Sequence, residues 1–340
     1  MNKKILAAAL VSSLPLFAQA QTSVTMYGVV DASFGIEDRD IAGEDHAVVV
    51  QSGTQSTSRI GFRGTEELGN GLKALFNLEA GVAVDSGAGD STLFQRRAVV
   101  GLQGNFGTVT VGREYSPIAA IAQATDALGH GFYGSSLAAF ATPAGALPRA
   151  TRRLSNSVNY KSNPWNGVVI GAAYGAGERQ SGPSNDVLGI SLEATQGNLY
   201  LGAAYQEVER LAAGNDKEYA SGIGYKFGAF EARAGYLVAD PTGANNAYEQ
   251  INVGGTWTTG PNKFFLQFQR QELGNGGKGN GFTLAYTYTL SKRTNLYGTF
   301  ATLRNNDVGN FGLTSAGGTL LSPLVGADPK AINVGVRHSF

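Results

Sequence analysis

The sequence contains no cysteine, so no disulfide bond stabilises the chain. Charged residues make up only 15% of it, whereas an average soluble domain has about 25%. Apart from a short stretch near the N-terminus, no apolar run reaches the roughly 18 residues that a transmembrane helix requires. Basic and acidic residues are equal in number, 26 of each, which argues against a nucleic-acid partner. These absences exclude a disulfide-rich domain and a helical membrane protein.

The N-terminus has the three parts of a secretory signal peptide. Lys3 and Lys4 form a positive start, Ile5–Phe17 is largely apolar, and Ala18–Ala20 has the small-x-small pattern of a cleavage site. We therefore predict that residues 1–20 are removed and that residues 21–340 form one domain. Without Lys3 and Lys4 the mature chain has 24 basic and 26 acidic residues, a net charge of −2.

Apolar and polar residues alternate along most of the mature chain. In the first such stretch, Met26, Val30 and Phe34 share one face, whereas Asp31 and Ser33 share the other. The clearest further stretches are residues 72–80, 198–207, 219–227, 230–237, 282–290 and 331–340. This period of two predicts about sixteen β-strands.

Short turns and long connections follow one another between these stretches. The predicted long connections cover roughly residues 36–55, 84–94, 115–152, 178–186, 209–217, 240–247, 273–280 and 304–330. The longest connection covers residues 115–152. A loop of this length without regular structure is uncommon and usually functional. Short turns on one side and long loops on the other are typical of bacterial outer-membrane barrels. Because every backbone amide must be paired in lipid, such a sheet closes on itself, and a barrel of this size has a water-filled lumen.

Several segments resemble the general trimeric porins of Gram-negative outer membranes, especially their β-proteobacterial branch. The resemblance lies in Val24–Ala32, Ser58–Ala74, Gly101–Arg113, Asn156–Tyr160 and Asn333–Phe340. It implies a 16-stranded antiparallel transmembrane β-barrel, a homotrimer, and a third loop, residues 115–152, that folds into the lumen as a constriction. It also implies passive diffusion of small hydrophilic solutes and ions through the outer membrane.

The bases expected at the constriction come from alternation and from the resemblance. By alternation Arg59 and Arg63 lie on the polar face, and the resemblance places Arg59 in the constriction. Arg96 matches a second wall arginine of the family. Lys161 and Arg153 are alternatives for a third base, since the former matches enterobacterial relatives and the latter the β-proteobacterial branch.

Acidic candidates for the opposite side of the constriction are few. Glu114 begins the long loop and Asp126 lies within it. Because several bases face few acids, we expect the channel to prefer anions. Arg97 and Arg113 are predicted to point outward, where a subunit interface or the headgroup region would lower the cost of a charge facing lipid.

Other signals suggest assembly rather than chemistry. Phe340 resembles the terminal aromatic residue by which such barrels are recognised for assembly. The acidic residues of loop 36–46 are either a divalent-cation site or, more commonly for such a run, a solvated surface. The three histidines have no ligand spacing, so we predict no metal site and no cofactor. The expected partners are further copies of the chain, outer-membrane lipid and lipopolysaccharide, the barrel assembly machinery, and small ions and solutes.

Three other functions remain open at this stage. A barrel enzyme requires a serine, histidine or acid constellation near the mouth, and we predict no enzyme because the histidines are few and scattered. A solute-specific channel is a second alternative, which solute competition with ion current would distinguish from a general one. A soluble secreted adhesin is the third, and extraction only by detergent would argue against it.

Overall fold

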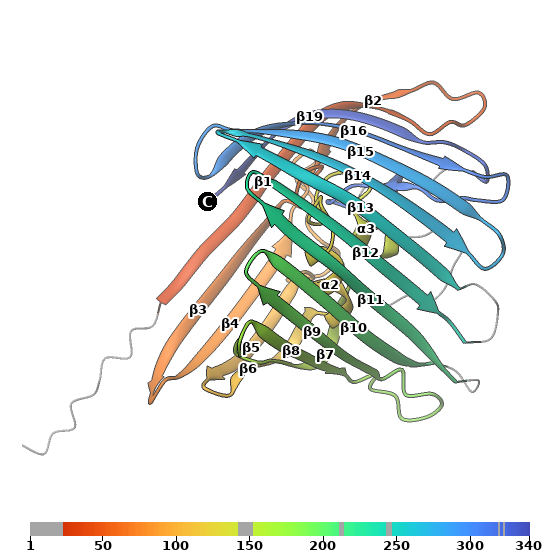
Figure 1. Ribbon diagram of the computed structural model, residues 1–340. Coiled ribbons are helices and arrows are strands. Elements are labelled where there is room, and N and C mark those ends of the chain that lie inside the picture. Colours follow the sequence, from red (N-terminus) through yellow and green to blue (C-terminus); the bar gives the residue numbers. More distant parts are fainter. Residues whose placement is uncertain (1–22, 142–151, 211–213, 243–246, 319, 322–323) are drawn as a thin grey trace, which may run out of the picture.

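The computed structural model describes residues 23–141, 152–210, 214–242, 247–318, 320–321 and 324–340. The predicted signal peptide lies outside the described residues. Nearly all regular structure is β-sheet (Figure 1). The strands are β1 (Ser23–Asp38), β2 (Ala47–Ser52), β3 (Arg59–Gly69), β4 (Leu72–Gly81), β5 (Arg97–Gly104), β6 (Gly107–Tyr115), β7 (Arg153–Lys161), β8 (Val168–Gly175), β9 (Val187–Gln196), β10 (Leu199–Arg210), β11 (Gly214–Phe227), β12 (Phe230–Asp240), β13 (Tyr248–Thr259), β14 (Asn262–Leu273), β15 (Lys278–Thr289), β16 (Thr294–Asn305), β17 (Leu313–Thr314), β18 (Leu320–Leu321) and β19 (Lys330–Ser339).

The sheet closes on itself through β1. One edge of β1 pairs with β19. Along the other edge, the first half of β1 pairs with β3 and the second half pairs with β2. All other pairs are antiparallel neighbours. Among the described residues, β1, β3 to β16 and β19 form a barrel of sixteen strands, which confirms the predicted fold. The main-chain N–H of Gly28 donates to the Phe340 carbonyl at 3.1 Å and completes the closure.

The outer surface of the barrel is apolar and its interior is polar. In β1, Val30 and Phe34 are exposed on the outside, whereas Asp31 and Ser33 are buried on the inside. Around the barrel, large apolar side chains are exposed and polar side chains are buried, which is the reverse of the arrangement in a soluble protein. It matches a wall whose outer face meets hydrocarbon and whose inner face meets water. The predicted alternation is therefore confirmed.

Aromatic rings form a row along the turn ends of β11 to β14. Phe227, Phe230, Trp257 and Phe264 stack in sequence on neighbouring strands, with ring centroids 5.7, 5.9 and 5.3 Å apart. Each ring is exposed on the outer face. This row supports the aromatic girdle that outer-membrane barrels carry at the membrane interface.

Some predicted loop boundaries were wrong. Part of loop 36–55 forms the strand β2, and most of the expected loop at residues 209–217 belongs to β10 and β11. Polar residues at positions 209–217 suggested a loop. Both strands nevertheless continue, because β10 and β11 stay paired as far as Arg210 and Gly214. The helices of the described residues are short. Among the described residues, no helix has both the length and the apolarity to cross a bilayer.

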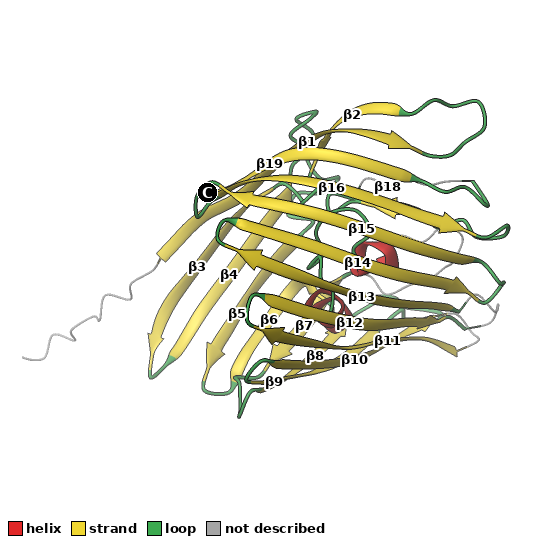
Figure 2. Cartoon of the chain, turned by 45° about the horizontal axis from the view of Figure 1, so that its top comes forward, coloured by secondary structure: helices red, strands yellow, loops and turns green. Residues whose placement is uncertain are grey.

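The long connection after β6 runs along the inner face of the wall. It contains helices α2 (Pro117–Ala124) and α3 (Ser136–Ala141), which Figure 2 shows among the surrounding strands. Helix α2 contacts β8 to β12, and the following residues bond to β13 to β15. We call residues 116–141 the inner segment; residues 142–151 of the predicted loop lie outside the described residues.

Helix α2 begins where the sequence favours a helix start. Ser116 is its N-cap and accepts a hydrogen bond from the Ala119 N–H at 3.2 Å, and Pro117 occupies the first turn. Ile118 and Ile121 are buried against the wall. The inner segment is thus held by apolar packing at α2 and by hydrogen bonds beyond it, which fixes the space left inside the barrel.

Candidate functional site

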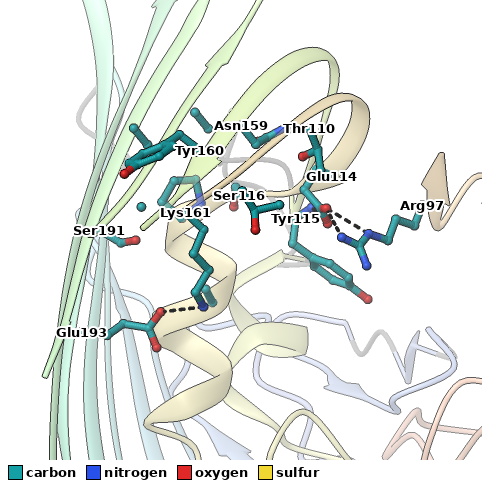
Figure 3. Close-up of a pocket in the computed structure, with 16 residues that line it drawn as sticks. Arg97, Thr110, Glu114, Tyr115, Ser116, Asn159, Tyr160, Lys161, Ser191 and Glu193 are labelled. Carbon is teal, nitrogen blue, oxygen red and sulfur yellow. Dashed lines mark hydrogen bonds and ion pairs between the residues drawn. The ribbon is translucent and has the colours of Figure 1, made fainter. Parts of the chain in front are cut away.

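An ion pair stands where the inner segment leaves the wall (Figure 3). The guanidinium of Arg97, at the start of β5, contacts the carboxylate of Glu114 near the end of β6, with Nε 2.9 Å from Oε2. The β6–β7 register shifts between Gly112 and Glu114. Gly112 adopts a φ of +127° there, and a Cβ atom would lie 2.1 Å from the Ala98 carbonyl oxygen. Glycine at this position therefore allows the bulge that leads into the inner segment.

The predicted outward orientation of Arg97 was wrong. Its register partner is Glu79, an inner-face residue, and Val99 two positions later is buried. Val100 and Leu102 are the exposed outer residues of this strand. Because β5 begins only at Arg97, the preceding Arg96 is not bound by the alternation, and both arginines reach the interior.

Arg113 differs from Arg97. Its guanidinium donates to the Ser155 hydroxyl at 2.6 Å and contacts the main-chain carbonyl of Gln95. Along β6 it is in step with Val111, which is exposed on the outer face. A role of Arg113 in subunit contact stays a prediction.

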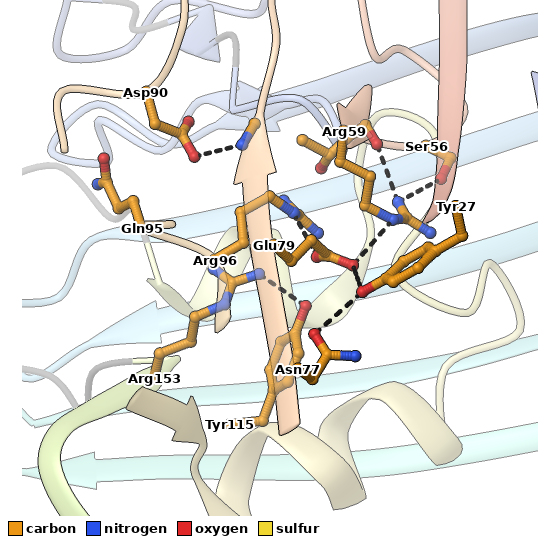
Figure 4. A network of polar contacts seen from close by, with 12 residues as sticks. Tyr27, Ser56, Arg59, Asn77, Glu79, Asp90, Gln95, Arg96, Tyr115 and Arg153 are labelled. Atoms are coloured by element: carbon orange, nitrogen blue, oxygen red, sulfur yellow. Dashed lines mark hydrogen bonds and ion pairs between the residues drawn. The ribbon is translucent and has the colours of Figure 1, made fainter. Parts of the chain in front are cut away.

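The main charged cluster lies on the inner face of β3 to β5 (Figure 4). The carboxylate of Glu79 accepts from two guanidiniums: Arg96 Nε lies 2.7 Å from Oε1, and Arg59 Nε lies 3.4 Å from Oε2. The Tyr27 hydroxyl also donates to Glu79, at 3.0 Å. Side chains of Arg96 and Glu79 are only 11% exposed. Burial of this kind makes the pair geometrically fixed rather than exchanging freely with solvent.

Arg59 has further contacts that hold its side chain. Its Nη1 donates to the Thr57 carbonyl at 2.9 Å and to the Ser56 hydroxyl at 3.2 Å. These bonds come from the chain just before β3, so the local sequence and the strand pairing position the guanidinium together. Of the predicted residues, the structure thus places Arg59 and Arg96 on one carboxylate.

A second pair of arginines joins the cluster from the start of β7. Arg153 Nη2 donates to the Tyr115 hydroxyl at 2.6 Å, and the guanidinium lies 4.4 Å from the Tyr115 ring centroid. The neighbouring Arg152 is also largely buried, and burial together with Arg153 lowers its pKa to about 10. It keeps its charge at neutral pH. Sequence analysis missed Arg152, although two adjacent arginines at the end of the long loop were visible in the sequence.

Glu79 was also missed as a site residue. Sequence analysis sought the acids of the site on the long loop and did not consider that one could stand on the wall. The signal was present, because Glu79 shares the polar face with Asn77 and lies in a strand next to that of the motif arginine Arg59. The carboxylate therefore lies among the bases instead of opposite them.

The inner segment faces this cluster across a recess of about 190 Å³. The recess is lined by residues that include Arg59, Arg96, Gln123 and His130. Burial and the surrounding arginines lower the pKa of His130 well below its usual value, so its imidazole is neutral at pH 7. The sequence between Tyr115 and Arg152 contains one acid, Asp126.

Asp126 does not face the recess, which corrects its predicted place in the constriction. Its side chain is fully buried, and its two oxygens accept from the main-chain N–H groups of Leu128 at 2.8 Å and Ser136 at 2.7 Å. Burial raises its pKa to about 6. The carboxylate closes a turn of the inner segment, because folded backbone amides are its nearest donors.

Two other predicted bases lie away from the cluster. The Arg63 guanidinium lies 5.1 Å from the Tyr27 ring centroid, on the turn side of the arginines. Lys161 Nζ pairs with Glu193 at 3.2 Å on β9. Of the alternatives for a third base, Arg153 is the one that stands beside Arg96 and Tyr115.

The charges of this region are unequal. Five guanidiniums gather around Glu79, those of Arg59, Arg96, Arg97, Arg152 and Arg153. The nearby carboxylates are those of Glu79, Glu114 and Asp31, the last of which accepts from the Ser56 N–H at 2.7 Å. A narrow passage lined by one sign of charge concentrates the opposite ion and lowers the barrier to its passage. The geometry thus suits conduction rather than bond chemistry.

A metal site has no support in the part of the chain that the structure describes. No group of three or more His, Cys, Asp or Glu side chains there could hold a metal ion. In the acidic loop 36–46, Glu44 pairs with Arg39, and Asp38 accepts from the Asp40 N–H at 2.8 Å. Carboxylates already engaged in this way are typical of a solvated surface loop.

Comparisons with known proteins agree with this architecture. Residues 6–308 match the family model described as Gram-negative porin. Over the full length of both chains, the sequence is 31% identical to outer membrane porin protein 32 of Delftia acidovorans and 30% identical to an outer membrane porin protein of Bordetella pertussis. The solved structure of an anion-selective porin from Comamonas acidovorans is similar with a TM-score of 0.82 at 29% identity, covering 94% of this chain and 100% of that chain.

Proposed function

Because this chain belongs to the Gram-negative porin family and forms an outer-membrane channel for passive diffusion, we propose that its channel prefers anions. The observation that carries the proposal is the excess of guanidiniums over carboxylates around Glu79. Glu79 neutralises part of the charge of Arg59 and Arg96. The acid of the inner segment, Asp126, is buried and turned away from the recess, and main-chain N–H groups of Leu128 and Ser136 donate to its carboxylate.

The location of the excess positive charge supports anion preference more strongly than its size does. Arg59 and Arg96 line the same recess as Gln123 and His130 of the inner segment, which supports a path for ions close to these guanidiniums. At physiological ionic strength charges are screened over about 8 Å. Charges farther away, including the acids of the outer loops, therefore have less influence on the choice between chloride and potassium.

Reversal potential in a planar bilayer tests this proposal. Purified, folded protein is reconstituted between two KCl solutions that differ tenfold in concentration. We expect a potential of the sign that chloride permeation produces, which decreases as the salt concentration on both sides is raised. A potential of the potassium sign would contradict anion preference while leaving the channel itself intact.

We also propose that the channel is a homotrimer. Its support is the outward Arg113 next to Ser155, because a guanidinium facing lipid at mid-depth costs roughly 2–4 kcal/mol and protein contact would remove that cost. Conductance steps grouped in threes, together with the mass of the detergent-solubilised complex, test this state. Single steps and a monomer mass would contradict it.

For export and assembly we propose removal of residues 1–20 and recognition of Phe340. The main chain of Phe340 bonds to Gly28 in both directions at 3.1 Å, so Phe340 takes part in closing the barrel, while its ring stays exposed. Lipopolysaccharide and the barrel assembly machinery are the partners this route requires. We further propose that the protein has no catalytic activity, which hydrolase assays of the pure protein test.

A further inference from the structure

A side recess lies between helix α2 and the inner wall of β6 to β9, apart from the arginine cluster (Figure 3). Its volume is about 340 Å³, which is at the lower end of the range for sites that hold small molecules. Pro117 and Ala120 of α2 form one side of it. Thr110, Asn159 and Ser191, from three different strands, belong to the other.

The charges of this recess are balanced, unlike those of the arginine cluster. Two ion pairs line it: Arg97 with Glu114, and Lys161 with Glu193. An anion entering the recess meets two acids as well as two bases, and a cation meets the reverse. A solute that carries one charge of each sign satisfies both, so the recess discriminates by dipole and not by net charge.

The Lys161–Glu193 pair is available to a solute. The Lys161 side chain is 62% exposed and Glu193 20% exposed, with 3.2 Å between Nζ and Oε1. An ammonium has three donors, and a solvent-exposed pair of this kind contributes little net free energy and exchanges easily. The Tyr200 hydroxyl donates to the other oxygen of Glu193 at 3.1 Å and holds this carboxylate in place.

The Asn159 side chain also belongs to the lining of the recess. Its Nδ2 donates to the Ser157 hydroxyl at 2.9 Å, which holds the amide in place. The remaining lining, Pro117, Ala120 and Ala173, is apolar and suits a hydrocarbon body between two charged ends.

The recess adjoins the recess at the arginine cluster. It shares Arg97 and Tyr115 with the recess at the arginine cluster, and Arg97, Thr108 and Thr110 with a further recess on the turn side. The side recess therefore adjoins the space beside the arginines, separated from it by the side chains of Arg97 and Tyr115.

We propose that this side recess binds small zwitterions with an apolar body, of the kind that apolar α-amino acids represent. The carboxylate of the solute pairs with Lys161, its ammonium pairs with Glu193, and its side chain packs on Pro117 and Ala120. The proposal rests on the channel function of the family and is independent of the anion preference proposed above.

The test uses L-valine as the probe and isovalerate, which has the same hydrocarbon body without the ammonium, as its matched anion. Single-channel conductance in KCl is measured as each solute is added to the protein in a planar bilayer. We expect valine to reduce the conductance along a saturating curve. The charge-balanced double variant Lys161→Gln with Glu193→Gln weakens the apparent valine affinity by roughly three- to tenfold.

The double variant removes one charge of each sign, so the reversal potential in a KCl gradient and the response to isovalerate stay as in the unmodified protein. The matched control is Lys73→Gln with Glu67→Gln, an exposed ion pair at the turn end of β3 and β4 with 2.6 Å between its charged atoms. It keeps the valine response. Ala120→Leu fills the recess without changing charge and abolishes saturation by steric exclusion.

Two results overturn the proposal. One is a valine response that is absent or strictly linear in a protein that conducts KCl normally. The other is a saturating response that both the Lys161–Glu193 variant and Ala120→Leu retain, because the valine then binds elsewhere. A reversal potential of the potassium sign in the unmodified protein would contradict only the anion preference. The two proposals can therefore fail independently of each other.

Discussion

Two parts of the barrel's inner wall carry opposite kinds of side chain. On β3 to β5 and at the start of β7 the wall presents guanidiniums and Glu79 to the passage. On β13 to β15, at the level of the inner segment, the buried inner residues are neutral: Gln250, Asn252, Gln267, Gln269, Gln271 and Thr283. We call these two regions the arginine wall and the covered wall.

The difference follows from what each wall faces. On the covered wall, side-chain amides bond to the main chain of the inner segment: Gln267 accepts from the Ala127 N–H and donates to the Gly134 carbonyl, both at 3.1 Å. Burying a neutral amide costs much less desolvation free energy than burying a charge. The arginine wall keeps contact with the passage, so charges are tolerated. The position of the inner segment therefore decides which part of the wall faces the passage.

The largest effect is expected from removing the charge of the arginine wall. The double variant Arg59→Gln with Arg96→Gln leaves Glu79 without its two guanidinium partners. We expect the reversal potential in a KCl gradient to fall markedly toward zero, because two guanidiniums are lost and the charge of Glu79 is no longer neutralised, while Arg97, Arg152 and Arg153 remain. Arg63→Gln, outside the cluster, serves as the control and changes the potential little. Equal effects of the two variants would show that position within the wall does not matter.

A charge placed on the covered wall tests the opposite side of the comparison. Gln267→Glu buries a carboxylate against the Gly134 carbonyl, and we expect a loss of about 3 kcal/mol or more of stability. Asn77→Asp makes the same change beside Arg63 and Arg97 and should cost far less. The temperature at which the folded band converts to the unfolded one in electrophoresis measures both. Similar losses would contradict the distinction between the walls.

The buried acid of the inner segment predicts a pH dependence. Burial raises the pKa of Asp126 from 3.8 to about 6, so the protonated form is favoured in the folded state. This contribution to stability is fully present below about pH 4 and is lost as the pH rises through 6, in all roughly 3 kcal/mol. Asp126→Asn does not titrate, so the difference in melting temperature between the two proteins should change over this range. A constant difference from pH 4 to pH 8 would refute it.

The smallest expected effect concerns the carboxylate of the arginine wall. Glu79→Gln keeps an acceptor for Arg96 and removes one negative charge, so chloride preference should increase about two- to threefold. Permeability ratios from reversal potentials measure it, and the gain should shrink at high salt because of screening. An unchanged ratio would mean that Glu79 only positions the two guanidiniums.

Much of the fold followed from the sequence because the signal there is local. Alternation with a period of two predicted the strands and their inner and outer faces, and Arg59 was placed correctly in this way. The same rule failed at Arg97, because the strand begins at that residue and the preceding chain is irregular. Alternation holds only inside a regular strand, and strand ends are where it is least certain.

The sequence by itself determined that the chain is a barrel with a polar interior and that arginines stand on its wall. Only the tertiary structure decided which charges meet. Glu79 contacts Arg59 and Arg96 across three strands, and Asp126 turns away from the passage because backbone amides of its own segment surround it. The physical reason is the sequence separation of the residues involved. The face on which a strand residue lies follows from its neighbours in the sequence. Contacts between strands, and the burial of an acid in a loop, depend on how the whole sheet closes.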